Sequence, residues 1–162
     1  MNAIATNSCV TILSVPRGSC FASDEGQRVT AQSGAWATKA LDRIGNLRTI
    51  RECAEEEWQV IRPSSAAQRS ALLMIWYLVN EGMYQLPETI VFPTRAGGIQ
   101  FEWNKNGREL QIEVHDDGTA ESLSTETDGT NREAELDLGQ ARDVVALARW
   151  LLEGHPQNGR WF

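Results

Sequence analysis

The fold of this chain is decided by one stretch of its sequence, Phe92-Pro-Thr-Arg-Ala-Gly-Gly-Ile-Gln-Phe-Glu-Trp-Asn-Lys-Asn-Gly-Arg-Glu-Leu-Gln-Ile-Glu-Val114. Asn106-Gly107 predicts a two-residue type I′ turn, because both central positions of that turn need a positive φ. A turn placed there opposes apolar residues in three cross-strand pairs, Trp103–Leu110, Phe101–Ile112 and Ile99–Val114. The polar residues between these pairs then share the other face, so a shift of one residue would destroy the pattern.

The sequence around this hairpin predicts further strands. Residues 89–92 are typical of a first strand, and turns at Asp117-Gly118 and Asp128-Gly129 predict two more strands after the hairpin. With two-residue turns, Ile112 would face Leu123, Val114 would face Glu121, and Leu123 would face Ala134. The inner face of the last two strands would then carry Glu121, Ala134 and Leu136. The prediction is an antiparallel β-meander of about five strands.

Three helical segments flank this sheet. Residues 36–60 carry an apolar stripe, Leu41, Ile44, Leu47, Ile50 and Ala54, with an interruption expected at Gly45-Asn46. Residues 66–83 follow a capping box of Ser65 and Gln68, and are apolar nearly all round, as in a central core helix or half of an interface. Asp137 with Gln140 is expected to cap a last helix, whose apolar stripe is Val144, Leu147, Ala148, Leu151 and Leu152. The predicted fold class is therefore α+β, with helices packed on one face of the sheet.

The chain divides into three parts. Residues 1–35 are rich in Ser, Thr, Gly and Asn, and are expected to form an irregular or partly disordered arm. Residues 36–154 are expected to form a single domain, and residues 155–162 a short tail. The tail ends in Trp161 and Phe162, which either dock on the domain or act as a linear motif.

Charge is unevenly distributed along the sequence. The formal net charge is −7, and residues 105–137 contain ten Asp or Glu against three Lys or Arg. Such a field repels nucleic acid and favours basic partners. The outward hairpin face is Gln100, Glu102, Glu109, Gln111 and Glu113. We predict partner binding by Glu102, Glu109, Gln111, Glu113, Trp161 and Phe162. A face that is only solvated remains the alternative.

Motifs for catalysis or cofactor binding are lacking. Cys9, Cys20 and Cys53 have neither metal-site nor disulfide spacing, and favour a reducing cytoplasm. His115 and His155 are expected in a turn and after a helix end. Gly97-Gly98 precedes a strand rather than a helix, so it is not a phosphate loop. We expect no catalytic residue, no metal and no cofactor. No apolar run is long enough to span a membrane, and no secretory signal is evident.

The hairpin also resembles a group of small bacterial proteins that have no assigned function. The resemblance rests on Pro93-Thr94, on Gly97-Gly98-Ile99-Gln100 and on Glu102-Trp103, and it extends over roughly residues 40–153. Arg62-Pro63-Ser64-Ser65 and the Leu-rich segment 146–152 match the flanking helices of that group. The group often carries Trp-Asp-Gly before its Pro-Ser helix, whereas this chain has Trp58-Gln59-Val60. The resemblance implies a bacterial, cytosolic module and supplies no catalytic residue.

Three hypotheses about function follow. The first is a non-enzymatic protein-interaction module, such as an antitoxin-like, immunity or phage-defence accessory protein that acts on a larger effector. It would bind through the acidic face, an edge strand or exposed Trp residues, and it could form a homo-oligomer. The second is a nucleic-acid-binding regulator that uses Arg43, Arg48, Arg51, Arg62 and Arg69, although the acidic balance makes nucleic acid unlikely. The third is an enzyme of unrecognised class.

Overall fold

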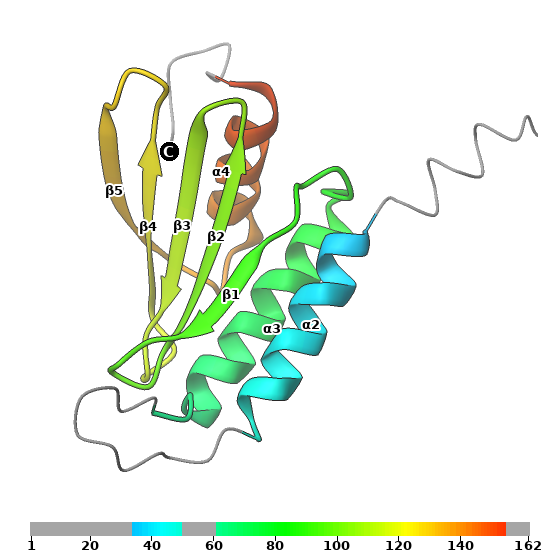
Figure 1. The fold of residues 1–162 in the computed structure, drawn as a ribbon, viewed down its shortest axis with the longest axis vertical. Helices are drawn as coiled ribbons and strands as arrows, with labels where there is room; N and C mark the ends of the chain where they lie inside the picture. The colour runs from blue at the N-terminus through cyan, green and yellow to red at the C-terminus, as the bar shows by residue number, and fades with distance from the viewer. Residues whose placement is uncertain (1–33, 50–60, 155–162) are drawn as a thin grey trace, which may run out of the picture.

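The computed structural model describes residues 34–49 and 61–154, and it has the predicted α+β fold (Figure 1). The helices are α2 (Ala35–Leu47), α3 (Ser65–Asn80) and α4 (Ala141–Glu153). The strands are β1 (Ile90–Pro93), β2 (Ile99–Lys105), β3 (Arg108–Val114), β4 (Ala120–Thr125) and β5 (Asn131–Leu136). The strands form one antiparallel sheet in the order β1-β2-β3-β4-β5. The meander is thus confirmed, with β1 beginning one residue later than predicted.

The hairpin of β2 and β3 has the predicted register. Trp103 pairs with Leu110, and Phe101 pairs with Ile112. The turn residues Asn106 and Gly107 have φ values of 54° and 76°. Both are positive, as a type I′ turn requires, and this explains why the sequence has Asn-Gly there.

The turn from β3 to β4 is one residue longer than predicted. The N–H of His115 donates to the carbonyl of Thr119 at 2.8 Å, which leaves a three-residue loop that ends in Gly118 with φ 92°. The Oδ1 atom of Asp117 accepts the Thr119 N–H at 2.8 Å and so holds this longer loop. Loops of this length place Gly in the left-handed region at their last position.

The turn from β4 to β5 repeats this arrangement. Glu126 pairs with Thr130, Gly129 has φ 86°, and Asp128 Oδ1 accepts the Thr130 N–H at 2.8 Å. The predicted two-residue turns at Asp117-Gly118 and Asp128-Gly129 are therefore wrong. An Asp-Gly-Thr sequence favours the longer loop, because the Asp side chain bonds the backbone two residues on.

The longer loops change which residues of β4 face the helices. Ile112 pairs with Ser122 rather than Leu123, and Ser122 rather than Leu123 pairs with Ala134. Glu121 therefore points away from the core and lies opposite Glu113, not Val114. Ser122 and Ser124 take the buried positions, and their hydroxyls lie 3.4 Å from the carbonyls of Ala134 and Arg132. Ala134 and Leu136 do lie on the inner face, as predicted.

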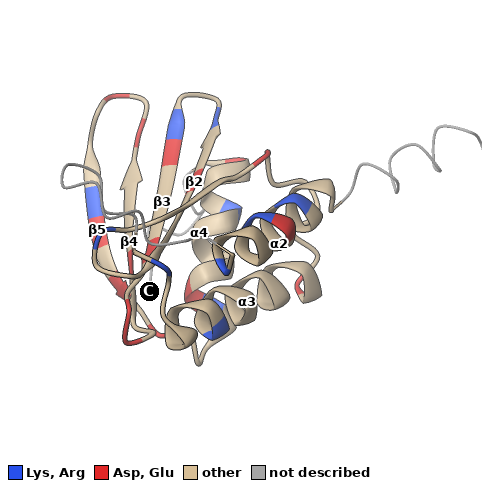
Figure 2. Cartoon of the chain, turned by 60° about the horizontal axis from the view of Figure 1, so that its bottom comes forward, with Lys and Arg blue, Asp and Glu red and all other residues tan. Residues whose placement is uncertain are grey.

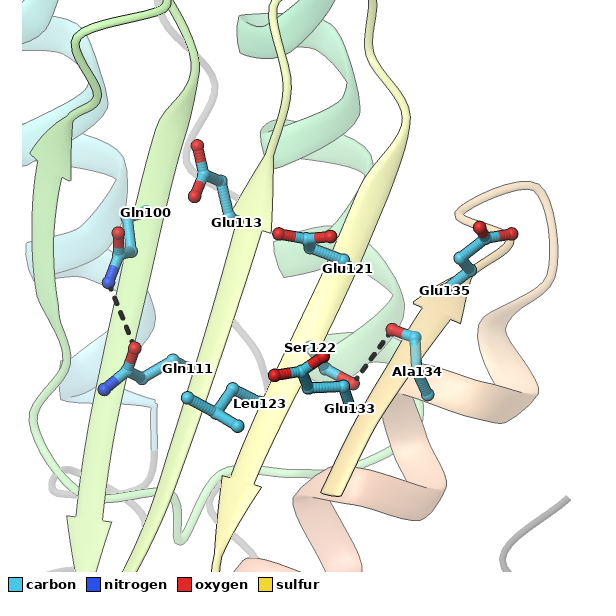
Figure 3. Close-up of a pocket in the computed structure, with 9 residues that line it drawn as sticks. All are labelled: Gln100, Gln111, Glu113, Glu121, Ser122, Leu123, Glu133, Ala134 and Glu135. Atoms are coloured by element: carbon cyan, nitrogen blue, oxygen red, sulfur yellow. Dashed lines mark hydrogen bonds between the residues drawn. The ribbon is translucent and has the colours of Figure 1, made fainter. Parts of the chain in front are cut away.

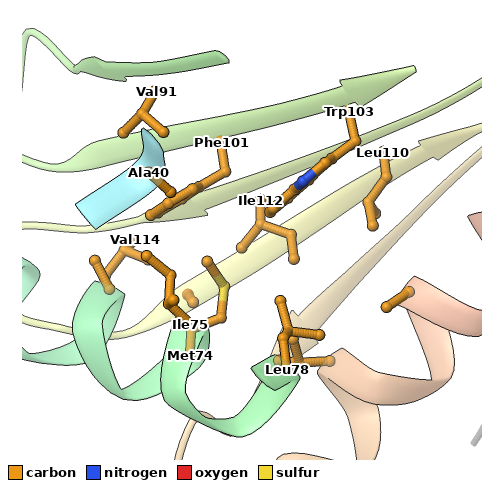
Figure 4. Packing of buried hydrophobic residues seen from close by; sticks show 14 of the residues in the cluster. Ala40, Met74, Ile75, Leu78, Val91, Phe101, Trp103, Leu110, Ile112 and Val114 are labelled. Atoms are coloured by element: carbon orange, nitrogen blue, oxygen red, sulfur yellow. The ribbon is translucent and has the colours of Figure 1, made fainter. Parts of the chain in front are cut away.

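The hydrophobic core lies between the sheet and the helices (Figure 4). Phe101, Trp103 and Ile112 are at most 2% exposed, so the predicted apolar face of the hairpin is the buried one. The rings of Phe101 and Trp103 are stacked with centroids 5.7 Å apart, and Trp36 meets Trp103 edge-on at 6.4 Å. These aromatic contacts connect α2 to the central strands.

The helix α2 differs from the prediction in two details. It runs through Gly45 and Asn46, where an interruption was expected, and ends at Leu47. Leu41 is 44% exposed rather than part of the buried stripe, because Trp36, Ala37 and Ala40 take the inner positions instead. The predicted continuation to residue 60, with Ile50 and Ala54, lies outside the described residues.

The helix α3 is capped at both ends. Its N-cap is Ser64 rather than Ser65, and the Ser64 Oγ accepts the N–H of Ala67 at 2.9 Å. Ser64 also donates through its hydroxyl to the carbonyl of Asp116, so the cap joins the helix to the β3–β4 loop. At the other end, Met83 N–H donates to Leu78 O and Gly82, with φ 76°, donates to Val79 O, which is a Schellman motif.

The helix α4 begins later than Asp137, which is not its N-cap. Asp137 accepts the Gly139 N–H and the Gln140 side-chain amide, both at 2.9 Å, in a turn that precedes the helix. Val144, Leu147, Ala148 and Leu151 are buried as predicted, and Leu152 is half-buried. Among the described helices, none is long and apolar enough to cross a membrane.

Candidate functional site

The outward face of the sheet is strongly acidic by its register, and Figure 2 marks the Asp and Glu positions of the strands in red. Six carboxylates point away from the helices, and we call them the acidic sheet face: Glu102, Glu109, Glu113, Glu121, Glu133 and Glu135. The Lys and Arg residues of the described strands, Lys105, Arg108 and Arg132, occupy positions of the opposite parity. The described strands therefore place only negative charge on this face.

One row across the sheet places like charges directly opposite each other. Glu113 pairs with Glu121, and Glu121 pairs with Glu135, while Gln100 extends the row on the other side of Glu113. Like charges in directly opposed positions destabilise a sheet. The row is thus an arrangement that folding alone does not favour.

His115 lies beside this row, close to both Glu113 and Glu121. Its Nδ1 is 3.7 Å from Glu113 Oε1, and its Nε2 is 3.7 Å from Glu121 Oε2. Both separations are longer than a hydrogen bond but within the range of an ion pair. A protonated His115 would offset part of the repulsion between the two carboxylates. As predicted, His115 belongs to a turn.

The row borders a hollow of about 450 Å³ in the sheet surface (Figure 3). Leu123 is half-buried and faces outward between the carboxylates. In Figure 3 the helices lie behind the sheet, so this hollow opens on the face that no described helix covers. The site combines a small apolar area with acidic surroundings.

Side-chain amides order the carboxylates nearer β1. The Gln100 amide donates to Glu102 Oε1 at 2.9 Å and lies 3.4 Å from Gln111 Oε1. Asn104 donates to Glu109 Oε1 at 3.2 Å. These bonds hold the Glu102 and Glu109 side chains in place without neutralising their charge.

The structure brings together four of the six residues predicted to bind a partner. Glu102, Glu109, Gln111 and Glu113 all lie on the outward face, whereas Trp161 and Phe162 lie outside the described residues. Glu121 was missed because the predicted register placed it inside, and Glu133 and Glu135 were not recognised as members of the site. The Asp-Gly-Thr sequence of both loops is the signal that could have placed Glu121 correctly, because it favours a three-residue loop and thereby the observed register of β4.

The described residues show no arrangement for metal binding. Within residues 34–49 and 61–154, no group of three or more His, Cys, Asp or Glu side chains is placed to hold a metal ion. Cys9, Cys20, Cys53 and His155 lie outside these ranges. The chemistry that this surface offers is charge and hydrogen-bond acceptance.

Comparison with known proteins adds no family. No family model matches the chain, and no curated protein or solved structure is significantly similar to it.

Proposed function

We propose that this protein is a non-enzymatic interaction module that binds a basic surface of a partner protein through its acidic sheet face. The observation that carries the proposal is the directly opposed row Glu113–Glu121–Glu135. Carboxylates at alternating positions would keep the protein soluble without being opposed to each other. A basic partner would offset the repulsion within this row, because its Lys or Arg side chains would neutralise charges that repel each other in the free protein.

The hollow supports a contact with specific geometry. Leu123 offers a half-buried apolar side chain at its centre, and carboxylates surround it. Interfaces commonly have an apolar centre and a polar rim. The partner surface that fits is therefore an aliphatic or aromatic side chain with Lys or Arg around it.

The face is a better candidate than the edges of the sheet. The edge strand β1 has four residues and ends in Pro93, which has no N–H to donate to an added strand. The other edge strand, β5, is rich in charged side chains, as edges that avoid pairing usually are. We therefore assign partner binding to the face and not to strand addition.

The biological setting that we propose follows the resemblance described above. The protein would be a bacterial, cytoplasmic partner of a larger effector, as an antitoxin-like, immunity or phage-defence accessory protein. Nucleic-acid binding is the second candidate. Arg43, Arg48, Arg62 and Arg69 are all exposed on or beside α2 and α3, whereas Arg51 lies outside the described residues.

The proposal can be tested with two variants of equal charge. The face variant is Glu121→Lys with Glu133→Lys, and the control variant is Asp42→Lys with Glu153→Lys. All four positions are exposed, so both variants should fold. Affinity isolation from cells should recover a protein with wild type and with the control variant, but not with the face variant. If no captured protein distinguishes the two variants, the proposal is wrong.

A further inference from the structure

A second surface lies on the opposite side of the molecule, where the end of α3 meets the start of α4. A hollow of about 310 Å³ is lined by Glu81, Ala141, Arg142, Val145, Ala146 and Arg149. Tyr77 of α3 borders it, because its hydroxyl lies 3.4 Å from the carbonyl of Gly139, just before α4. Trp76 and Leu73 do not line the hollow but are exposed on α3 near it, and we call the hollow together with these two residues and Tyr77 the helix groove.

The α3 side of the helix groove exposes large apolar side chains. Trp76 is 56% exposed, and Leu73, one helical turn before it, is 38% exposed. The ring of Trp76 packs edge-on against Tyr77, with centroids 5.1 Å apart, so the two rings form one aromatic wall. The core-facing side of α3 is complete without them, because Met74, Ile75 and Leu78 fill it.

The α4 side of the helix groove supplies two cations, with Asp143 Oδ1 3.6 Å from Arg142 Nε and Glu81 on the α3 side of the hollow. Arg142 and Arg149 are both exposed and are seven residues apart, so they lie on one side of α4 at a separation of roughly 10 Å along its axis. Ala146 lies between them and leaves room for another chain, and Val145 is buried beneath. Exposed Trp, Tyr and Arg are the residues most enriched at the energetic centres of protein interfaces.

We propose that the helix groove binds an acidic amphipathic helix of a partner protein. A helix presents apolar side chains every three or four residues, which fits the wall of Leu73, Trp76 and Tyr77. Carboxylates two turns apart on that helix would reach Arg142 and Arg149. The acidic sheet face lies on the other side of the sheet from α3 and α4, and salt screens the interaction between exposed charges beyond a Debye length of about 8 Å.

This binding is independent of the acidic sheet face, and each surface can be tested alone. The probe is a displayed library of 18-residue helical peptides with a fixed apolar stripe and randomised charges at the flanking positions. Selection is carried out on the full-length protein. We expect enrichment of peptides that carry Glu or Asp two turns apart. We also expect Trp76→Ala to weaken their binding at least about tenfold, as at an interface hot spot.

Two further variants locate the bound peptide. Arg142→Glu with Arg149→Glu should abolish selection of acidic peptides and favour basic ones, whereas the face variant should leave their binding unchanged. Leu41→Ala removes an exposed apolar side chain on α2 and should also have no effect. The proposal is overturned if no peptide is enriched, if the enriched peptides have no acidic bias, or if they bind Trp76→Ala as well as wild type. It is also overturned if wild type dimerises through Trp76 in sedimentation experiments, because a second copy would then occupy the groove.

Discussion

Glu113 and Glu121 lie directly opposite each other on neighbouring strands, and Glu135 continues the pair on the next strand. The sheet thus carries two adjacent pairs of like charge on a face that no described helix covers. Each such pair opposes the fold by a fraction of a kcal/mol. The arrangement is explained if a positively charged partner occupies this face.

The first prediction concerns the energy of this row. Glu121→Lys replaces two repulsive pairs by two attractive ones, so it should raise the free energy of unfolding by about 1 kcal/mol. Urea titration at low and high salt measures this, and the gain should shrink in high salt because screening weakens both kinds of pair. Asp42→Lys, with the same charge change on α2, should bring no gain. A Glu121→Lys protein less stable than wild type would show that the row does not strain the sheet.

The second prediction concerns the core. Phe101 is fully buried, whereas Ile90, an apolar residue of the neighbouring strand, faces outward and is 61% exposed. Phe101→Ala should lower the free energy of unfolding by about 3–5 kcal/mol. Ile90→Ala should change it by less than about 0.5 kcal/mol. Similar losses for the two variants in a denaturant titration would contradict the assigned faces of the sheet.

The third prediction compares one substitution at two glycines. Gly107 has φ 76°, and an added Cβ would lie 3.0 Å from Thr127, so Gly107→Ala should destabilise the protein. Gly45 lies inside α2 with no atom within 4 Å of an added Cβ, so Gly45→Ala should stabilise it by about 0.5–1 kcal/mol. Thermal unfolding measures both changes. Shifts of the same sign would mean that one of the two backbone conformations is wrong.

The fourth prediction concerns a buried arginine. Arg108 is 8% exposed, and its guanidinium donates to the Trp150 carbonyl at 2.8 Å near the end of α4. A cation there is a second donor to a carbonyl that already accepts the Gly154 N–H at 2.8 Å, and it interacts favourably with the helix dipole. Arg108→Met should cost about 1.5–3 kcal/mol of unfolding free energy. Arg142→Met, at a largely exposed position of α4, is the control and should cost little unfolding free energy. Equal costs would contradict the capping role.

The fifth prediction concerns pH and the β3–β4 loop. The Thr119 hydroxyl and N–H donate to Asp117 at 2.6 and 2.8 Å, which lowers the pKa of that carboxyl below its ordinary value of 3.8. A lowered pKa contributes stability above the ordinary value and loses it as the pH falls through the folded-state pKa. The stability difference between wild type and Asp117→Asn should therefore be constant near neutral pH and shrink below about pH 4. A difference that is independent of pH would exclude this contribution.

The β2–β3 hairpin could be predicted because its determinants are local. Asn106-Gly107 fixes the turn, and the alternation of apolar and polar residues in both strands allows only one register. The same reasoning failed for β4. Its only large apolar residue, Leu123, points outward, and the buried positions are held by Ser122 and Ser124. The two-residue turn predicted at Asp117-Gly118 assigned the wrong face to that strand, and the weak apolar pattern of β4 did not correct it.

Other features depend on contacts between distant parts of the chain. Ser64 rather than Ser65 caps α3, and the Ser64 hydroxyl also reaches the Asp116 carbonyl in a loop that follows β3. The role of Arg108 becomes visible only when the end of α4 is placed beside β3. The full acidic sheet face likewise required the register of β4, because Glu121 is central to it.

The account is tested most directly by the rate at which the protein associates with the partner recovered by affinity isolation. The face variant, Glu121→Lys with Glu133→Lys, should remain folded and associate at least about fivefold more slowly at low salt. The control variant, Asp42→Lys with Glu153→Lys, should associate at close to the wild-type rate, and added salt should reduce the difference. Equal association rates for the two folded variants would contradict the proposal that the acidic sheet face binds the partner.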